Sequence, residues 1–447
     1  MRKTPLDEWI ARKIRGGQDS PSPLSRNEID RYQFEKIRET VDYAPRNSPF
    51  YRRLLEGRSG SELKGLNDLV SFPFTTGDDI RESALRFLCV SQDEIARVVT
   101  LNTSGTTGVS KRLFFTADDL ELTVDFFHHG MSTLISPGQK VLILLPGDKK
   151  DSVGDLLKRG LARMDVEGIV HGPVRDVDNT ISDIMKFSAD CLVGIPTQVL
   201  WIARTAGGVI PAGRIKSVLL STDYVPQAVV RELESRWHCP VFAHFGMTET
   251  GLGCAVECEV RSGYHIREAD FYVEIVDPET GQTCREGQAG EIVFTTLTRR
   301  GMPLIRYRTG DISHFMTEPC PCGSVLGRLG TVAGRLDGRV PLGKDHTVTI
   351  IDLDESLFPI EGLINYSAEV VRGDGKTRLV LFLYAGTSTD LKIAKAAREA
   401  ASSIPGVRQA IAEGLLEVPL PYFSTENQFT TGVGKRRIGQ GMIMGDG

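Results

Sequence analysis

The sequence contains no apolar run that approaches the roughly 18 residues needed to cross a bilayer. Its N-terminus, MRKTPLDEWIARKIRGG, also lacks the apolar core of a signal peptide. No lysine and arginine cluster with interleaved aromatic residues is present, and the formal net charge is −5. We therefore expect neither a membrane nor nucleic acid as a partner, and a cytoplasmic location.

Cysteine is scarce: eight cysteines in 447 residues are too few for a disulfide scaffold. In a reducing compartment, a close pair of cysteines points first either to a metal or to no special function. The chain has no internal repeat and no low-complexity tract. Its length and its 40% apolar content predict one large domain and a smaller one.

The chain also lacks the Walker loop, whose pattern GxxxxGK[ST] places glycine directly before lysine. In LNTSGTTGVSK, residues 101–111, Ser110 precedes Lys111 instead. The segment still predicts a phosphate-binding loop, because glycines allow close backbone approach while hydroxyls and a lysine supply donors and charge. A flexible linker is the alternative, but the loop lies between predicted strands at residues 96–101 and 112–116. The predicted phosphate-binding residues are Thr103, Ser104, Gly105, Thr106, Thr107, Gly108, Ser110 and Lys111.

The pattern is mostly helical up to about residue 95, with an amphipathic helix at residues 27–41 and prolines 45, 49 and 73 closing segments. Strands and helices then alternate, which implies right-handed βαβ units and a largely parallel sheet covered by helices. Short segments between residues 271 and 312 predict antiparallel strands or a small barrel. The alternating helices are predicted at residues 118–134, 152–164, 198–205 and 227–237, and the strands at 140–145, 191–195, 216–220 and 241–245.

A boundary is predicted at residues 334–338, where glycines flank Arg335 and Asp337. About a hundred residues follow with the pattern of a small α+β domain. It closes with a glycine-rich, basic loop, TTGVGKRRIG. Its strands are predicted at residues 347–351, 364–371, 377–384 and 415–419, and its helices at 359–363 and 391–404.

Two motifs place carboxylates after predicted strands. FGMTETG presents Glu249 beside Thr248, and a hard oxygen ligand next to a triphosphate suits Mg²⁺. A helix cap is the alternative for this pair. YRTGD places Asp311 after a tight turn, where its carboxylate could accept hydrogen bonds from both ribose hydroxyls or only stabilise its own turn.

Two further motifs contain basic side chains. In GRLD, Arg335 could reach a ribose or a phosphate, and Asp337 could change conformation as a hinge. In GVGK, Lys435 lies on a loop of the small domain, where a solvated basic tail is the alternative.

Together these motifs carry a resemblance. The order TSGTTGVSK, FGMTETG, GEIVFTTLTRRGMPLIRYRTGD, GRLDG and GVGKRRI resembles the adenylate-forming superfamily of acyl-CoA synthetases, in its phenylacetate–CoA ligase-like branch. The match spans roughly residues 30–440. Single motifs are modest, but five of them in the right order and spacing make a coincidence improbable.

The resemblance implies an α/β fold with a large N-terminal adenylate-forming (AMP-binding) domain, residues 1–334, which has parallel-rich sheets and a small β-barrel-like subdomain. A hinge at residues 335–338 and a small, mobile α+β C-terminal lid domain, residues 339–447, follow. It also implies a two-step reaction. A carboxylic acid attacks the α-phosphorus of ATP to give an acyl-adenylate and pyrophosphate, and the thiol of CoA then displaces AMP. The acid, phenylacetate-like or another aryl acid, follows from family analogy alone.

The same resemblance implies roles in the phosphate chemistry. Residues 103–111 hold the β- and γ-phosphates, Glu249 holds Mg²⁺, and Thr248 touches the α-phosphate. Lys435 bridges the attacking carboxylate and the α-phosphate in the first step. Rotation about Asp337 then withdraws Lys435 and admits the thiol.

The resemblance also implies a nucleoside site. Phe245 and Gly246 lie against adenine, although relatives usually carry tyrosine at the first position. Asp223, in STDYVP, stands near a glutamate of the family's adenine turn. Asp311 and Arg335 hold the ribose.

Cysteine and histidine residues suggest a second metal site. Cys258 and His265 lie near each other in sequence, and Cys320 and Cys322 form PCPCG. Two such pairs separated by a hairpin could make a tetrahedral zinc site, with buried structural thiols as the alternative. The resemblance favours a structural zinc held by these four residues, with Cys254 in reserve.

The segment after the predicted hinge departs from the family, because GRVPLGKDHTVTIIDLDESLF lacks the glycine-containing loop that lines the thiol tunnel. Two alternatives to a CoA ligase therefore stay open. One is an adenylating enzyme with another acceptor, such as a carrier protein or a cofactor hydroxyl. The other is a catalytically silent nucleotide-binding accessory protein. Acid specificity is expected along residues 124–131, 148–172 and 245–253, and a homodimer is the default oligomeric state.

Overall fold

The computed structural model describes residues 2–18, 22–101, 110–343, 345–373, 376–386, 389–425, 427 and 436–442. The chain forms two compact units. Unit 1 comprises Met1–Pro137, Lys149–Val166 and Ala243–Ala333, and unit 2 comprises Gly138–Asp148, Glu167–Phe242 and Gly334–Gly447. The predicted division at residues 334–338 stays a prediction.

Unit 1 begins with the helices α1 (Pro5–Ile14), α2 (Arg26–Asn47), α3 (Pro49–Leu54) and α4 (Gly77–Ser83). Ser25 starts α2 through a reciprocal capping box with Glu28. The predicted helix at residues 27–41 is confirmed, but it continues through Pro45, which lies inside the last turn instead of closing the segment. The helix can continue because Ile37 and Val41 are fully buried and hold it against the unit.

The strands that flank the predicted phosphate-binding loop are confirmed as the antiparallel pair β1 (Ile95–Leu101) and β2 (Lys111–Thr116). Their register places Leu101 opposite Lys111. Helix α5 (Ala117–Met131) follows at once, because Thr116 and Asp119 form a capping box. It packs with α6 (Val153–Ala162).

The antiparallel strands predicted between residues 271 and 312 are also confirmed, as β10 (Phe271–Val276), β11 (Gly290–Thr296) and β12 (Tyr307–Ser313). Unit 1 also holds antiparallel pairings of β8 (Ala255–Glu257) with β7 (Val241–Phe245) and with β9 (Tyr264–Ile266). Strand β9 pairs in turn with β13 (Arg328–Leu329). These short strands bring the predicted metal ligands together.

Unit 2 contains the parallel sheet that alternation predicts. Its strands β3 (Lys140–Ile143), β4 (Glu167–Val170), β5 (Cys191–Gly194) and β6 (Ser217–Leu220) lie in the order β6-β5-β3-β4. Every residue of β5 and β6 is buried, as expected for central strands of a parallel sheet. Helix α7 (Val177–Phe187) connects β4 to β5, α8 (Pro196–Ala206) connects β5 to β6, and α9 (Gln227–Trp237) follows β6.

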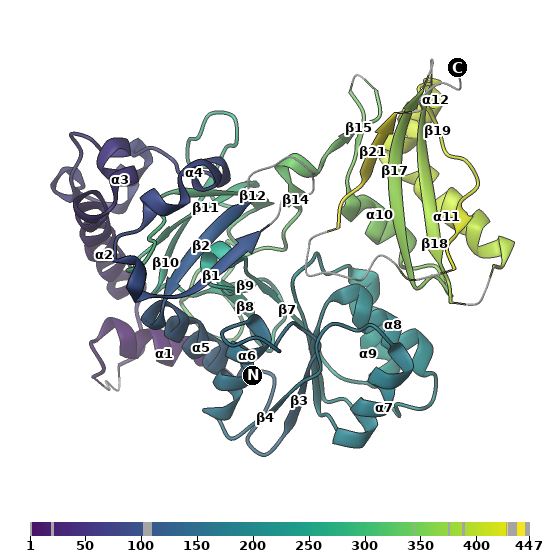
Figure 1. Cartoon of the computed structure of the whole chain (residues 1–447), viewed down its shortest axis with the longest axis horizontal. Helices are drawn as coiled ribbons and strands as arrows, with labels where there is room; N and C mark the ends of the chain where they lie inside the picture. The colour runs from purple at the N-terminus through teal and green to yellow at the C-terminus, as the bar shows by residue number, and fades with distance from the viewer. Residues whose placement is uncertain are drawn as a thin grey trace. The chain divides into compact units, whose positions relative to one another are not determined.

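The C-terminal part of unit 2 is α+β, as predicted. The long hairpin β17 (Asn365–Gly373) and β18 (Lys376–Tyr384) dominates it in Figure 1. Strand β21 (Gly439–Met442) adds to β17 in parallel, and β19 (Leu416–Glu417) and β20 (Tyr422–Phe423) add to β18 in parallel. Helices α10 (Ile350–Leu357), α11 (Leu391–Ser403) and α12 (Pro405–Ala412) complete it.

Two predictions in this part are wrong. The strand expected at residues 347–351 is only β16 (Thr347–Val348), and the helix expected at residues 359–363 is a turn. A capping box between Thr349 and Asp352 starts α10 at residue 350, although isoleucines open it. Leu353 and Leu357 are fully buried and override the strand propensity.

Among the residues described, no helix is both long enough and apolar enough to cross a membrane.

Candidate active site and metal centre

Three sequence motifs meet at the carboxylate of Glu249. This residue lies in the short helix η5 (Thr248–Thr250), directly after β7, and is 2% exposed. Lys111, the first residue of β2, forms an ion pair with its Oε1 atom. The hydroxyl of Tyr307, on β12, donates to the same oxygen at 3.1 Å and lies 3.3 Å from the Lys111 Nζ atom. The predicted phosphate lysine and the predicted magnesium ligand are therefore neighbours in a buried cluster.

The backbone around Glu249 is held from several sides. Arg299 donates from Nη1 to the Glu249 carbonyl oxygen at 2.8 Å, and its guanidinium lies 4.7 Å from the Phe115 ring centre. Burial lowers the pKa of Arg299 to about 10. The Thr123 hydroxyl donates to the Gly251 carbonyl oxygen at 2.7 Å. Arg299, one of two consecutive arginines at residues 299–300, is thus a buried cation that holds the backbone at Glu249 in place.

Tyr307 and Arg299 were missed as site residues by sequence reasoning. Tyr307 opens the YRTGD motif, four residues before the predicted ribose ligand Asp311, and both are buried on β12. Because Tyr307 lies in a motif that already supplied a predicted site residue, the sequence could have suggested it as a site residue. Arg299 also lies within one of the motifs, GEIVFTTLTRRGMPLIRYRTGD, but surface and buried arginines look the same in a sequence.

The predicted adenine residues of unit 1 also lie at the end of β7. Phe245 is buried and pairs with Ala255 of β8. Gly246 is tightly enclosed, because a Cβ atom there would lie 2.6 Å from the Leu252 carbonyl oxygen. Thr248 is the first residue of η5. Their contacts with a nucleotide stay a prediction.

The remaining predicted residues divide between the two units. In unit 1, the Asp311 backbone N–H donates to the Thr309 hydroxyl at 3.0 Å. In unit 2, Arg335 donates from Nε to Asp337 at 3.1 Å, and Arg437 donates to the other carboxylate oxygen of Asp337 at 3.0 Å. Burial opposes ionisation of Asp337, but the two arginines lower its pKa. A shared ribose site for Asp311 and Arg335 stays a prediction.

Asp223 lies in unit 2, in the loop after β6. Its Oδ2 atom accepts a hydrogen bond from Arg436 Nε at 2.9 Å, and its Oδ1 atom accepts one from the Tyr224 backbone at 2.9 Å. The predicted adenine contact is therefore engaged with a protein cation.

Two groups of predicted residues lie outside the described residues. They are Thr103, Ser104, Gly105, Thr106, Thr107 and Gly108 of the phosphate-binding loop, and Lys435 near the C-terminus.

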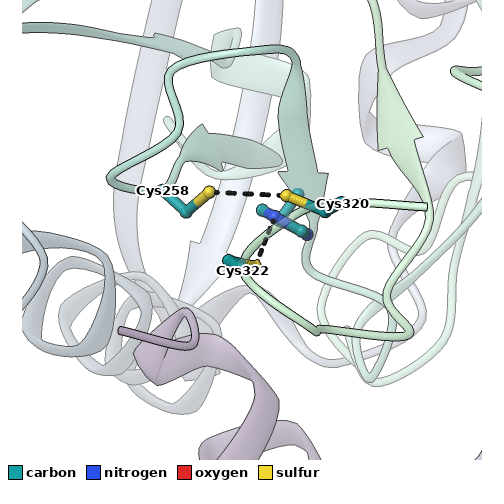
Figure 2. A group of neighbouring side chains, drawn as sticks. Cys258, Cys320 and Cys322 are labelled. Atoms are coloured by element: carbon teal, nitrogen blue, oxygen red, sulfur yellow. Dashed lines mark hydrogen bonds between the residues drawn. The ribbon is translucent and has the colours of Figure 1, made fainter. Parts of the chain in front are cut away.

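The four predicted zinc ligands come together in unit 1. Cys258 follows β8, His265 lies on β9, and Cys320 and Cys322 lie in the segment before β13. Their ligand atoms all lie within 4.8 Å of one another. The sulfurs of Cys258 and Cys320 are 3.7 Å apart, and Cys322 Sγ is 3.5 Å from His265 Nε2. Figure 2 shows the three cysteines turned toward a common point.

The chemistry of this cluster suits zinc. Burial and the positive charge of Arg328 lower the pKa of His265 to about 4, so its imidazole is neutral, as a metal ligand must be. Burial raises the pKa of the Cys258 thiol to about 12 and also raises that of Cys320. A cation at the centre would stabilise the thiolates that burial disfavours. Three sulfurs and one nitrogen match a structural Cys₃His site. Cys254 is buried but is not one of these four.

Sequence comparisons find a matching family and similar proteins. The family described as AMP-binding enzyme matches residues 90–297. A phenylacetate–coenzyme A ligase of Thermus thermophilus is 29% identical over 362 residues, covering 79% of this chain and 80% of the relative. A phenylacetate–coenzyme A ligase of Escherichia coli is 26% identical over 375 residues, covering 79% of this chain and 82% of the relative.

Solved structures agree on the fold. A 2-hydroxyisobutyryl-CoA ligase in a postadenylation state, in complex with an acyl-AMP, has a TM-score of 0.77 at 21% identity, covering 93% of this chain and 90% of that one. An anthranilate–CoA ligase bound to anthranoyl-AMP has a TM-score of 0.52 at 16% identity, covering 74% and 64%. With its motifs in the family's order and its fold shared, the chain belongs to the adenylate-forming superfamily of AMP-forming acid–thiol ligases, in the phenylacetate–CoA ligase-like branch.

Proposed function

We propose that the chain activates a phenylacetate-like or other aryl carboxylic acid with ATP and transfers the acyl group to CoA. The observation that carries the proposal is the buried cluster of Lys111, Glu249 and Tyr307, which joins three motifs from distant parts of the sequence. A cation and a carboxylate side by side suit a triphosphate with its counter-ion. The names of the sequence relatives support phenylacetate as the first acid to test.

In the proposed first step, Lys111 and residues 103–108 bind the β- and γ-phosphates. Glu249 would hold Mg²⁺, whose charge offsets that of the phosphates, and its buried carboxylate suits this hard cation. Thr248 would contact the α-phosphate, and Lys435 would approach the attacking carboxylate. Because the carboxylate is already a nucleophile, these groups need only orient it and offset negative charge.

The nucleoside would lie against Phe245 and Gly246, with Asp311 and Arg335 at the ribose. Asp223 was also predicted near adenine, but its carboxylate accepts a hydrogen bond from Arg436. In the second step, rotation about Asp337 would withdraw Lys435 and admit the thiol of CoA.

Acid selection would involve α5, because two of the segments predicted to set specificity meet there. A Cβ atom on Gly253 would lie 2.3 Å from a ring carbon of Phe126, so only glycine fits beside this aromatic side chain. An apolar wall of this kind separates related acids weakly. The acids tested as substrates should therefore form a panel of aryl, arylacetic and short hydroxy acids.

Acid-dependent exchange of pyrophosphate into ATP, followed by CoA consumption, tests the proposal. We expect both activities with at least one arylacetic or aryl acid. Exchange without CoA consumption would favour another acceptor, such as a carrier protein or a cofactor hydroxyl. No exchange with any acid of the panel would contradict the enzyme and favour a silent nucleotide-binding protein.

We also propose that Cys258, His265, Cys320 and Cys322 hold a structural zinc. Four protein ligands would leave no open position for substrate. We expect one zinc per chain by elemental mass spectrometry, and removal by a chelator should lower Tm by about 5 °C or more.

Cys320→Ser should reproduce that loss, whereas Cys284→Ser should not, because Cys284 lies outside the cluster and is half-exposed. Zinc-free protein with unchanged Tm would refute the site.

A further inference from the structure

Arg436, the neighbour of Lys435, is inserted between two carboxylates of unit 2. Its Nε atom donates to Asp223 at 2.9 Å and its Nη2 atom to Asp354 at 2.5 Å. Its side chain is only 11% exposed, and the Phe358 and Tyr366 rings lie 5.3 and 5.6 Å from the guanidinium carbon. Burial disfavours its charge, but Asp354 and Asp223 together raise the pKa of Arg436 above its ordinary value.

The two carboxylates belong to different segments of the unit. Asp354 lies on α10 in the C-terminal part and accepts a hydrogen bond from the Tyr366 hydroxyl of β17. That side of the contact is therefore internal to the C-terminal part. Asp223 comes from the loop between β6 and α9. The bond from Arg436 to Asp223 thus joins the C-terminal part to the segment that carries the parallel sheet.

A second link lies directly beside the first. The next residue of α10, Glu355, accepts hydrogen bonds from the Tyr224 hydroxyl and from the Gln227 backbone N–H, both at 2.8 Å. Asp354 therefore engages this loop through Arg436, whereas its neighbour Glu355 bonds directly to Tyr224 of the same loop. This pairing has a defined register, unlike an isolated surface ion pair, whose contribution is small.

We propose that Asp223 is a positioning residue that docks the C-terminal part through Arg436 and so holds the neighbouring Lys435 ready for adenylation. This inference rests on the proposed function. Arg436 directly follows Lys435 in the sequence, so the docking acts one residue from the lysine proposed to approach the attacking carboxylate. The alternation between half-reactions would break the Arg436–Asp223 and Glu355 links, while the Arg436–Asp354–Tyr366 contacts would move as a body. Asp223 thereby has a role other than contact with adenine.

Asp223→Asn, which keeps the shape and removes the charge, tests the docking in the ligand-free protein first. Amide hydrogen exchange should rise in peptides spanning residues 223–230 and 350–358. The matched control is Arg378→Gln, which removes an exposed ion pair with Glu417 inside the C-terminal part. It should leave both peptides unchanged. Unchanged exchange in Asp223→Asn would overturn the docking, and this readout needs no substrate.

The half-reactions then test positioning, with phenylacetate and chemically prepared phenylacetyl-adenylate as probes. Pyrophosphate exchange by Asp223→Asn should fall about tenfold in kcat with little change in KM for ATP. Thioester formation from phenylacetyl-adenylate and CoA should stay within about twofold. Asp223→Glu should restore part of the exchange. A raised KM for ATP with unchanged kcat, or equal loss of both half-reactions, would overturn the proposal. Wild-type protein inactive on phenylacetate would count against the proposed acid alone, and hydrogen exchange would then decide the docking.

Discussion

Glu249→Gln should lower acid-dependent pyrophosphate exchange by about 10²–10³-fold, because it removes a preorganised charge from a buried site. The carboxylate is 2% exposed and lies against Lys111 and Tyr307, so water cannot readily replace it. Glutamine retains the volume and one oxygen but offers no anionic ligand to Mg²⁺. The apparent affinity for Mg²⁺ should therefore weaken together with the rate, which a magnesium titration of the exchange reaction measures.

Tyr307→Phe is the matched control for this substitution. It removes a hydroxyl that contacts the same oxygen at 3.1 Å and keeps the carboxylate. We expect a smaller loss, about tenfold, with the magnesium dependence unchanged. Calorimetric titration with Mg²⁺ and ATP gives the same comparison without an acid substrate. Wild-type magnesium dependence in Glu249→Gln would show that this carboxylate is not a metal ligand.

Glu274→Gln should lower the free energy of unfolding by about 3–5 kcal/mol, because it leaves a buried cation uncompensated. Arg306 binds Glu274 through Nε and Nη2 at 3.2 and 3.0 Å, and the two side chains are only 1% and 5% exposed. Burial raises the pKa of Glu274, and Arg306 opposes that rise. Arg306 also donates from Nη1 to the carbonyl oxygens of Val70 and Phe72. The midpoint of urea unfolding, followed by circular dichroism, measures the loss.

Two variants control this experiment. Lys36→Gln breaks an exposed pair with Glu39 and should cost at most about 1 kcal/mol. Arg306→Met combined with Glu274→Leu removes both charges and should recover part of the stability lost in Glu274→Gln. A loss below about 1 kcal/mol in Glu274→Gln would show that water still reaches the arginine. Because Arg306 precedes Tyr307, the pair also supports the strand that carries the hydroxyl in contact with Glu249.

Local patterns predicted much of the fold. Helix α9 has the bounds expected from its apolar spacing, and β1, β2 and the central strands of the parallel sheet lie where alternation placed them. Strand β4 and helix α7 were not predicted. Strand β4 has four residues, includes a glycine and is only partly buried, so its apolar signal is weak. Helix α7 does carry an apolar stripe with Ile181 and Ile184 buried, and its polar composition obscured it.

The candidate site, like the fold, was predicted from the sequence only in part. The sequence by itself determined the superfamily, and it singled out Lys111, Glu249 and the four cysteine and histidine residues that the structure brings together, because motif order and residue chemistry are local properties. Only the tertiary structure decided that Tyr307 and Arg299 complete the Glu249 cluster, and that Asp223 faces Arg436. The physical reason is that burial and pairing of charge depend on residues distant in sequence. An aspartate or glutamate has the same side chain whether it contacts a nucleotide or an arginine, and only the fold determines which of the two it contacts.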